Sequence, residues 1–427
     1  MNKKASTTVF LSVIFVSMAL AVIASIEICR EMTIKSECMV FGKVWAKAIL
    51  SEYDRFLLED YGIMAYQGPD IVVASKINTY AQYSIDDKLG IRLKRSGAEL
   101  DGYEISIPSN FKKALKDAFV VESFDTLLNS EGRIKRGDLD EGENRVINNT
   151  VVLDTLPSNG IRSSIGVAAI SDYLENGSIS GYIKDKAVGA AVEMGFIRKY
   201  FDNYLYLSGG EDSYFRNEWE YIVNGDSNDK RNLEDCKRKI FLIRNALNLA
   251  YLAKDSEKQL LLSTVSQSLS PGPGGVLIQA VLTEAWAAAE SKYDLDQLLD
   301  DQKIPLIKTE ASWHTDLDGI INSSDVIKKL DDEALENLDE AREIVKESNT
   351  AGGVLSEIVE GQGYEDYLML LMLAVPENTR LLRIMDIVQT NMKYRYYADF
   401  NLEEYFIGVR FNVNANGRTY EFEDAYK

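Results

Sequence analysis

The chain has 427 residues and a formal net charge of −20, with 67 Asp and Glu against 47 Lys and Arg. This acidity argues against broad binding to nucleic acid and against adsorption of the acidic part to anionic lipid, because both require Lys and Arg. One His and three Cys argue against a multi-histidine metal site and a disulfide framework, and 28 Gly with 7 Pro disfavour a disordered chain.

The first predicted element is a transmembrane anchor over residues 5–28. Residues 5–26 contain no charge, and a helix of that length is about 33 Å long, enough to cross a hydrocarbon core of roughly 30 Å. Lys3 and Lys4 precede the apolar run, and the positive-inside tendency keeps them cytoplasmic. We therefore expect residues 1–4 to be a cytoplasmic tail and the remaining chain to lie outside the cell membrane.

Two other interpretations of this segment stay open. Ala19-Leu20-Ala21 resembles a signal-peptidase site, so a cleaved secretory signal is one alternative, and a buried core helix is another. Apolar residues continue to Ile28 without a helix breaker, which favours the uncleaved anchor. A lipoprotein anchor at Cys29 is excluded, because Glu27 and Ile28 stand where that signal requires small residues.

Helical periodicity continues beyond the anchor over residues 29–61. Apolar residues recur at steps of three or four and so share one helix face: Ile34, Cys38, Phe41, Trp45, Ile49, Tyr53 and Phe56. We expect a stalk helix, continuous with the anchor, whose apolar stripe packs on the exterior body. Cys29 and Cys38 are about 13 Å apart on such a helix, beyond the roughly 7 Å that a disulfide can span.

Residues 62–427 are predicted to form one exterior α+β domain. Alternating polar and apolar residues predict strands near 91–107, including residues 103–108, and residues 129–160 have the polar, Gly- and Asn-rich composition of an exposed loop or insert. Helical patterns dominate residues 163–397. The clearest helices are predicted over residues 229–253, 275–292 and 376–393.

The C-terminal residues 404–424 predict a β-hairpin. Apolar residues alternate on both sides of Asn416-Gly417, a dipeptide typical of tight hairpin turns. Since a lone hairpin is not stable, we expect it to pair with the strands near 91–107 or with the stalk. The predicted fold class is helix-rich α+β, with a long N-terminal transmembrane and stalk helix, a helical exterior body and a small antiparallel sheet.

One stretch resembles a metal-binding motif. Residues 314–325 resemble a calcium loop, with oxygen ligands at Asp316, Asp318, Asn322 and Asp325. His314 stands at the first position, where a hard cation prefers a carboxylate, and no second copy of the motif occurs. The alternative is a turn followed by a helix capped by Asn322 or Ser323, with His314 as a structural or surface residue.

The sequence singles out no catalytic residue and no cofactor. The segment Pro271-Gly272-Pro273-Gly274-Gly275 is similar to a phosphate-binding loop, but no Gly-Lys-Ser/Thr follows, so we predict a plain loop. The 67 acidic residues offer many pairs for a hydrolase, yet nothing distinguishes one of them. The 23 Tyr suit contacts with proteins or carbohydrate.

The N-terminal residues resemble those of TadE/TadG-like pseudopilins of the tight-adherence (Tad) pilus. The resemblance rests on Lys3-Lys4-Ala5-Ser6-Thr7-Thr8-Val9-Phe10-Leu11-Ser12 and Glu27. In contrast to pilins, residues 6–10 contain no acid, and no clear Gly precedes a processing point. The resemblance therefore implies an accessory or tip-like component, or a non-processed membrane protein.

More of the chain resembles an uncharacterised family of Gram-positive bacteria with such an N-terminus. The shared segments are Ser51-Glu52-Tyr53-Asp54-Arg55, Tyr61-Gly62, Asn217-Glu218-Trp219-Glu220-Tyr221-Ile222, Asp229, Asn232-Leu233, Arg244-Asn245-Ala246-Leu247-Asn248, Ala285-Trp286-Ala287-Ala288-Ala289-Glu290-Ser291, Ile304-Pro305-Leu306-Ile307-Lys308, Tyr364-Glu365-Asp366-Tyr367-Leu368, Arg383-Ile384-Met385-Asp386, Gln389 and Asn391. They span most of residues 5–393 and carry no catalytic residue over to this chain.

We therefore expect a single-pass membrane protein that is a non-catalytic structural or accessory component of a Tad-like pilus or secretion apparatus. Its expected partners are the lipid bilayer, through residues 5–28, and other subunits of that apparatus, but not nucleic acid. Two alternatives are a membrane-tethered cell-wall hydrolase with a carboxylate pair and an extracellular polymer-binding module. A cleft with two facing acids would favour the hydrolase.

Overall fold

The chain forms two compact units in the computed structural model. Unit 1 comprises Met1–Val121 and Asp399–Lys427, and unit 2 comprises Glu122–Ala398. The structure describes residues 3–85, 90–119, 133–136, 156–159, 170, 190–208, 213–330, 332–348 and 361–426. The part expected to be one exterior domain is thus divided, because its first residues and its C-terminal strands pack with the N-terminal helix.

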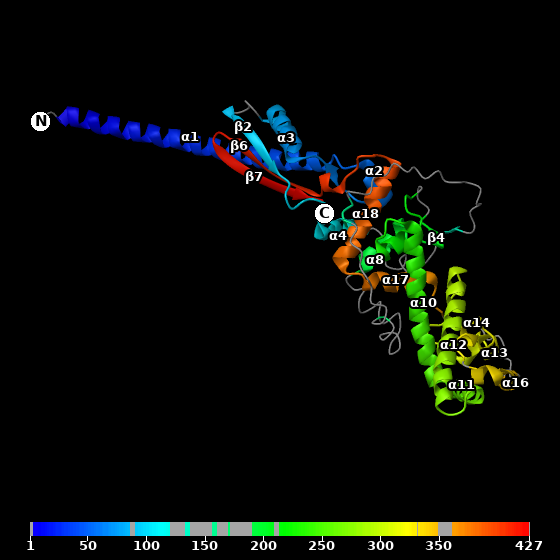
Figure 1. Cartoon of the computed structure of the whole chain (residues 1–427). Coiled ribbons are helices and arrows are strands. Elements are labelled where there is room, and N and C mark those ends of the chain that lie inside the picture. The colour runs from blue at the N-terminus through cyan, green and yellow to red at the C-terminus, as the bar shows by residue number, and fades with distance from the viewer. Residues whose placement is uncertain are drawn as a thin grey trace. The chain divides into compact units, whose positions relative to one another are not determined.

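Unit 1 begins with the long helix α1 (Lys3–Leu50), followed by the short helix α2 (Arg55–Tyr61). The expectation of one uninterrupted helix through residue 61 is wrong at residues 51–54. Asp54 ends the continuity because its carboxylate caps α2, accepting hydrogen bonds from the backbone of Phe56 at 2.9 Å and Leu57 at 3.0 Å. Figure 1 shows the N-terminal part of α1 extending beyond the strands against which its C-terminal part lies.

The C-terminal hairpin is confirmed. Strands β6 (Gly408–Ala415) and β7 (Arg418–Ala425) pair antiparallel around Asn416 and Gly417, whose φ angles of 49° and 86° suit the tight turn. β6 also pairs with β2 (Leu93–Glu99), so the sheet order is β2-β6-β7. The expected pairing of the hairpin with the strands near 91–107 is therefore confirmed for β2.

Residues 103–108, expected as a strand, are not one. Glu104 forms a single bridge to Phe406, and helix α4 (Pro108–Phe119) begins with a proline, which suits a first helical turn. The remaining elements of unit 1 are helix α3 (Asp70–Ser84), the strand pair β1 (Tyr66–Gln67) and β5 (Tyr405–Phe406), and the short helix η4 (Leu402–Glu404).

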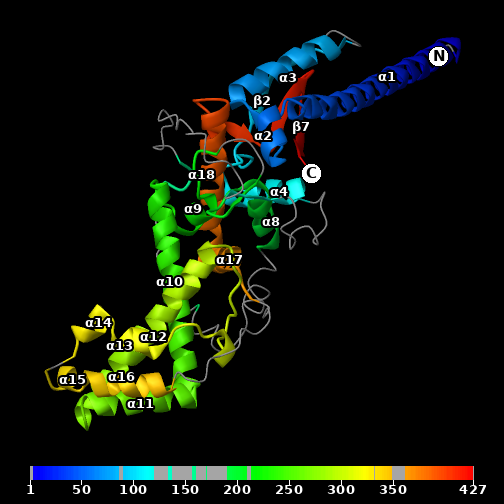
Figure 2. The same ribbon diagram turned by 90° about the vertical axis from the view of Figure 1, so that its right-hand side faces the viewer.

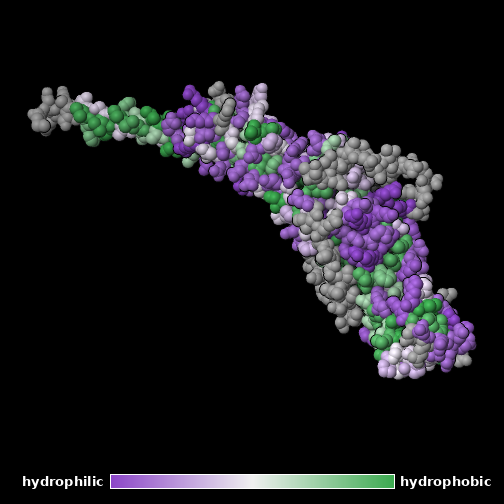
Figure 3. Space-filling view, viewed as in Figure 1, coloured by the Kyte–Doolittle hydropathy of each residue, from purple (hydrophilic) through white to green (hydrophobic). Residues whose placement is uncertain are grey.

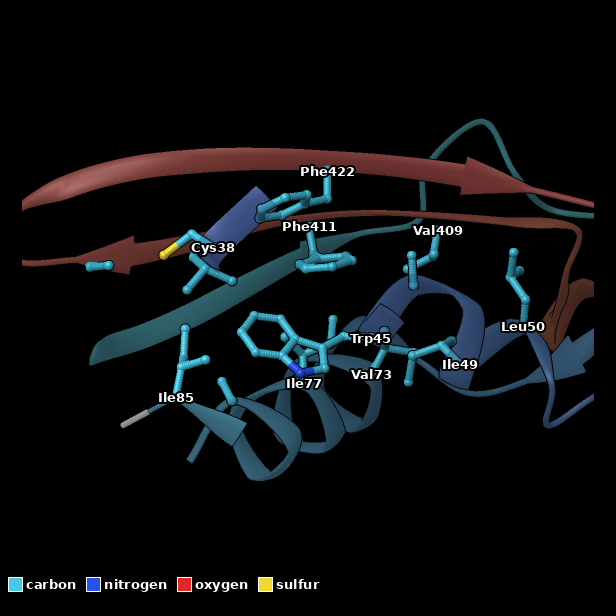
Figure 4. Packing of buried hydrophobic residues seen from close by; sticks show 14 of the residues in the cluster. Cys38, Trp45, Ile49, Leu50, Val73, Ile77, Ile85, Val409, Phe411 and Phe422 are labelled. Carbon is cyan, nitrogen blue, oxygen red and sulfur yellow. The ribbon is translucent and has the colours of Figure 1, made fainter. Parts of the chain in front are cut away.

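The core of unit 1 lies between α1, α3 and the sheet. Figure 4 shows Trp45 of α1 among side chains from the other two layers. The cluster contains Ile34, Cys38, Trp45 and Ile49 of α1, Val73 and Ile77 of α3, and Val409, Phe411, Val413 and Phe422 of the sheet. The apolar stripe predicted for residues 29–61 is therefore the buried face of α1 as far as Leu50.

Unit 2 is built mainly of helices. They are α8 (Ala191–Tyr200), α9 (Glu218–Asn224), α10 (Asp229–Lys254), α11 (Ser256–Leu269), α12 (Pro273–Leu299), η3 (Glu310–Ser312), α13 (Leu317–Ile321), α14 (Ser324–Ile327), α15 (Asp332–Glu336), α16 (Leu338–Ser348), α17 (Tyr364–Ala374) and α18 (Glu377–Arg395). Strands β3 (Ile134–Lys135) and β4 (Tyr206–Leu207) pair antiparallel. Figure 2 shows α10 and α12 side by side, with α11 packed against α12.

The helices expected over residues 229–253, 275–292 and 376–393 are confirmed as α10, α12 and α18. Pro273, assigned to a loop by the sequence pattern, is the first residue of α12. Of the loop or insert expected over residues 129–160, the structure describes only 133–136 and 156–159; the rest lies outside the described residues.

Gly42 offers a test of the contact between α1 and the sheet. A Cβ atom at this position would lie 2.2 Å from Cε1 of Phe422, whose ring stacks on Phe411. Gly→Ala normally stabilises a helix by about 1 kcal/mol, but here we expect Gly42→Ala to lower the free energy of unfolding by about 1–3 kcal/mol through overpacking. Urea unfolding of the detergent-solubilised chain measures the change. Ser36→Ala, on the exposed face of α1, is the control; a gain of stability in Gly42→Ala would contradict the contact.

Candidate functional site

The N-terminal part of α1 is apolar, and none of the residues that the structure describes buries it. Large side chains from Val9 to Ile28 are exposed, for example Phe10 at 65% and Phe15 at 77%. Figure 3 shows these apolar residues along the extended part of the helix. Among the described residues, α1 is the one helix that is long and apolar enough to cross a membrane. Its length and composition are consistent with the predicted anchor.

The polar residues of this segment are satisfied within the helix. The hydroxyls of Ser12, Ser17 and Ser25 each donate a hydrogen bond at 2.8 Å to a backbone carbonyl three or four residues earlier. A hydroxyl that is bonded in this way exposes little unsatisfied polarity to hydrocarbon. The serines therefore do not argue against a membrane-spanning segment.

Beyond the apolar segment, charged residues resume on α1 at Glu27, near the hairpin turn. Arg418, just after the turn, forms an ion pair with Glu31 at 2.6 Å, and Arg30 lies 3.5 Å from Glu27. These four residues, with Tyr420 and others, line a hollow of about 130 Å³. Two arginines and two glutamates leave this hollow without net charge, so it has no preference for an ion of either sign.

The calcium-loop candidates do not surround one point. Asp316 caps α13, because its side chain accepts a hydrogen bond from the backbone N–H of Gly319 at 2.8 Å. The Asn322 side chain donates to the backbone carbonyl of Asp318 and accepts from Arg342 at 2.7 Å. Asp325 lies in α14 with its side chain 90% exposed. Ser323, not Asn322, caps α14. Among the described residues, no group of three or more His, Cys, Asp and Glu could hold a metal ion.

His314, whose side chain is 41% exposed, borders a buried polar network beside this segment. Its ring stacks on Tyr293 with centroids 4.5 Å apart, and its Nδ1 lies 3.6 Å from Glu290. Glu290 also accepts hydrogen bonds from the backbone of His314 at 3.1 Å and of Thr315 at 2.9 Å. His314 thus has contacts of the kind expected for a structural residue.

Four buried charged residues, which we call the ionic cluster, continue this network. They are Arg244 of α10, Glu290 and Asp294 of α12, and Lys308, and none is more than 3% exposed. Lys308 Nζ lies 2.5 Å from Glu290 and 2.6 Å from Asp294, and Arg244 lies 2.8 Å from Asp294. Two cations and two anions cancel, which is the condition under which charges tolerate burial.

The ionic cluster fastens an irregular segment to the helices. Arg244 donates to the carbonyls of Pro305 at 3.2 Å and Leu306 at 2.8 Å, and Lys308 donates to the carbonyl of Ser312 at 2.8 Å. The carbonyls of Pro305 and Leu306 are therefore bonded to α10, and the backbone N–H groups of His314 and Thr315 are bonded to α12. Loss of one charged partner would leave the others uncompensated, at a cost of about 3–5 kcal/mol.

A second buried group lies in α9, where Glu218 and Glu220 are both 0% exposed. We call them the α9 carboxyl pair. Glu218 accepts from Asp202 N at 2.6 Å and from Asn391 at 2.7 Å. Burial, and then the Asp202 carboxylate, raise the pKa of Glu218 to about 8. Burial raises the pKa of Glu220 to about 7, against the lowering effect of a hydrogen bond from Tyr364.

The opposite end of α9 is capped by a buried guanidinium. Arg383 donates to the carbonyls of Ile222 at 2.8 Å, Val223 at 2.9 Å and Asn224 at 3.1 Å. Gly225 follows with φ of 72°, and a Cβ there would lie 2.5 Å from Arg383 Nε. A cation at the last carbonyls suits the negative end of the helix dipole.

Neither buried group has the geometry of a hydrolase pair. Hydrolysis requires that substrate and water reach both carboxyl groups, whereas Glu218, Glu220, Glu290 and Asp294 are all 0% exposed. Each of these acids is held by backbone or side-chain donors from neighbouring elements. The arrangement supports precise positioning of helices and loops, because a buried polar group is stable only with its own partners in place.

The ionic cluster and the α9 carboxyl pair were not predicted from the sequence. Two features of the sequence could have indicated them. Arg244 and Asn248, and likewise Glu290 and Asp294, are spaced by four residues, so each pair lies on one helix face among apolar neighbours. In addition, nearly all of these polar residues occur in the segments on which the family resemblance rests.

The α9 carboxyl pair predicts a pH dependence of stability. In the folded chain the carboxyl groups of Glu218 and Glu220 stay protonated up to pH about 7–8. In the unfolded chain they lose their protons near the ordinary pKa of 4.5. The folded state then binds more protons within this window, so the free energy of unfolding falls as pH rises through it. We expect Glu218→Gln, which is neutral at every pH, to reduce this slope in urea unfolding between pH 5 and 8.5.

The control is Glu257→Gln, at an exposed position of α11, which should keep the wild-type slope. Loss of one acceptor oxygen in Glu218→Gln lowers stability by an amount that does not vary with pH, so the slope, not the absolute stability, is the measurement. An unchanged slope in Glu218→Gln would contradict the assignment.

Comparison with known proteins identifies a family. No curated protein and no solved structure matches the chain. Residues 139–417, well over half of the chain, match a family described as "Family of unknown function (DUF5702)". The matched span contains the ionic cluster, the α9 carboxyl pair and strand β6, and the expectation of an uncharacterised family is confirmed. The chain therefore belongs to the DUF5702 family of unknown function.

Proposed function

We propose that this chain is a single-pass membrane protein that acts as a structural or accessory component of a Tad-like pilus or secretion apparatus. The observation that carries the proposal is α1, whose first half is an exposed apolar helix and whose second half is buried in unit 1. One helix thus joins a segment that requires an apolar environment to a folded unit that does not.

The exposed half of α1 requires a nonpolar surrounding. In water, each large apolar side chain that stays exposed forgoes about 1.5–3 kcal/mol of burial free energy, and more than ten such side chains lie between Val9 and Ile28. A bilayer supplies the surrounding for a free subunit, and apolar helices of neighbouring subunits supply it within an assembly. Lys3 and Lys4 support an N-terminus on the cytoplasmic side.

The proposed role is non-catalytic because the polar groups of unit 2 are used to hold its own elements. The ionic cluster and the α9 carboxyl pair form contacts between helices and loops of unit 2. Such contacts suit a subunit that must present a fixed surface. The Tad-like assignment rests on the resemblance of the N-terminal residues. The proposed partners are the bilayer, through residues 5–28, and other subunits of the apparatus.

Membrane topology can be tested with the native cysteines. Cys29 is exposed just beyond the apolar segment, whereas Cys38 and Cys236 are 0% exposed. We expect a membrane-impermeant maleimide to label intact cells at Cys29, and Cys29→Ser to abolish the labelling. In the Cys29→Ser background, Asn2→Cys should react only after the membrane is permeabilised. The reverse pattern would overturn the orientation, and recovery of the chain in the soluble fraction would overturn the anchor.

The structural role is tested by deletion and complementation. Cells that lack the chain should lose surface filaments or secretion through the apparatus, and the full chain should restore them. A version in which a cleavable secretory signal replaces residues 1–28 should be released and fail to restore assembly, because the body is no longer held at the membrane. Normal assembly in the deletion strain, or cell-wall hydrolysis by the purified chain that Glu218→Gln abolishes, would contradict the proposal.

A further inference from the structure

Three aromatic side chains of unit 2 surround one point near the end of α10. Tyr251 lies in the last turn of α10, Trp286 in α12, and Trp313 directly after η3. The Tyr251 and Trp313 rings stack with centroids 5.3 Å apart, and Trp286 meets Trp313 edge-on at 5.7 Å. We call these three rings the aromatic cage. It is separate from the ionic cluster and from the α9 carboxyl pair.

The ammonium group of Lys258 occupies the aromatic cage. Its Nζ lies 5.7 Å from the ring centroid of Tyr251, 5.9 Å from that of Trp286 and 5.8 Å from that of Trp313. A cation within about 6 Å of a ring centroid is attracted by the negative face of the ring, and aromatic cages of this kind recognise quaternary ammonium ligands. The ammonium group of Lys258 therefore lies where a ligand of this kind would place its own cation.

Carboxylates add to the attraction for a cation. Asp255 Oδ2 lies 3.4 Å from Lys258 Nζ and accepts a hydrogen bond from the Tyr251 hydroxyl at 2.7 Å. Burial and then Asp255 raise the pKa of the Tyr251 hydroxyl, and the Glu310 and Glu257 carboxylates contribute in the same direction. The site thus combines three rings with negative charge, the two features that bind a quaternary ammonium group.

The cage does not depend on the lysine for its shape. Asp255 Oδ1 caps α11 by accepting from the backbone of Glu257 and Lys258, at 3.1 and 3.0 Å, wherever the lysine side chain lies. Trp286 donates to the Thr315 carbonyl at 3.1 Å. Lys258 is in the first turn of α11, with its side chain 15% exposed on a flexible four-carbon stem, so it can leave for water without unfolding the helix.

We propose that the aromatic cage binds a quaternary ammonium group of the choline type, and that Lys258 closes the site when the ligand is absent. The ligand's trimethylammonium group takes the position of Lys258 Nζ, which lies beside the three packed rings and next to Asp255. Trp313 Nε1, which is buried and without a hydrogen-bond partner within the described part of the chain, is a donor for a ligand oxygen next to the ammonium group. Binding releases the lysine to solvent.

The test is a titration of the full chain, solubilised in a maltoside detergent that carries no ammonium group. Choline should change the tryptophan fluorescence in a saturable way. Lys258→Ala should tighten binding by roughly ten-fold, because the ligand no longer competes with an internal cation that keeps the site closed. Phosphocholine is titrated beside choline: tighter binding of phosphocholine assigns the ligand to a lipid or polymer headgroup, and tighter binding of choline assigns it to a free small molecule.

Matched controls separate this site from general effects. Lys254→Ala removes an exposed lysine at the end of α10, four residues before Lys258, and should leave the affinity for choline unchanged. Trp313→Leu should abolish binding while circular dichroism stays that of the folded chain. The neutral isostere of choline, with carbon in place of nitrogen, should not bind. Saturation-transfer NMR of choline methyl protons on the wild-type chain provides a readout that needs no variant.

Three results would overturn the proposal. They are a folded Lys258→Ala variant that does not bind choline more tightly than the wild type, binding of the neutral isostere as strong as that of choline, and retained binding in Trp313→Leu. If Lys258→Ala fails to fold, absence of saturation transfer from the wild-type chain to choline or phosphocholine decides against the site.

Discussion

The burial of α1 is the constraint on which unit 1 depends. α1 is one continuous helix. Before Ile28 its exposed surface is apolar on all sides, and after Ile28 only one stripe is apolar. The stripe needs a partner surface, and the β2-β6-β7 sheet and α3 supply it. Because β6 and β7 follow α1 by more than 350 residues, the buried half of α1 cannot be fully packed until residues 408–425 have folded. The close approach at Gly42 shows how tightly the helix and the sheet fit.

Unit 2 has an apolar core of its own, which includes Leu252, Leu282 and Trp286, and adds to it the pairing of buried charges. Arg244, Asp294, Lys308 and Glu290 cancel one another, and Arg383 and the α9 carboxyl pair complement the two ends of a short helix. Such groups add less stability than apolar packing of the same volume, but they penalise any arrangement in which a partner is missing. For the subunit role that we propose, this favours one rigid surface. The aromatic cage differs from both groups, because its cation, Lys258, is partly exposed to solvent.

Periodicity predicted much of the secondary structure and less of the packing. The apolar length of α1, the spacing in α10, α12 and α18, and the Asn416-Gly417 turn are local signals, and the structure contains each element. The interruption at Asp54 was missed because an N-cap residue differs little from an exposed helical residue in sequence. Residues 103–108 alternate like a strand, yet Glu104 pairs only once, because a ladder depends on what a neighbouring strand offers and not on alternation alone.

The sequence by itself determined that the chain begins with an apolar segment able to span a membrane, that its body is acidic and helix-rich, and that it ends in a hairpin. These properties follow from composition and from periods of two and 3.6 residues, which are local. Only the tertiary structure decided that Asp316, Asp318, Asn322 and Asp325 act as caps and surface groups, that Lys308 lies between Glu290 and Asp294, and that Lys258 lies among three rings. The reason is that a charge acquires its role from the groups that surround it in space, and these come from segments far apart in the chain.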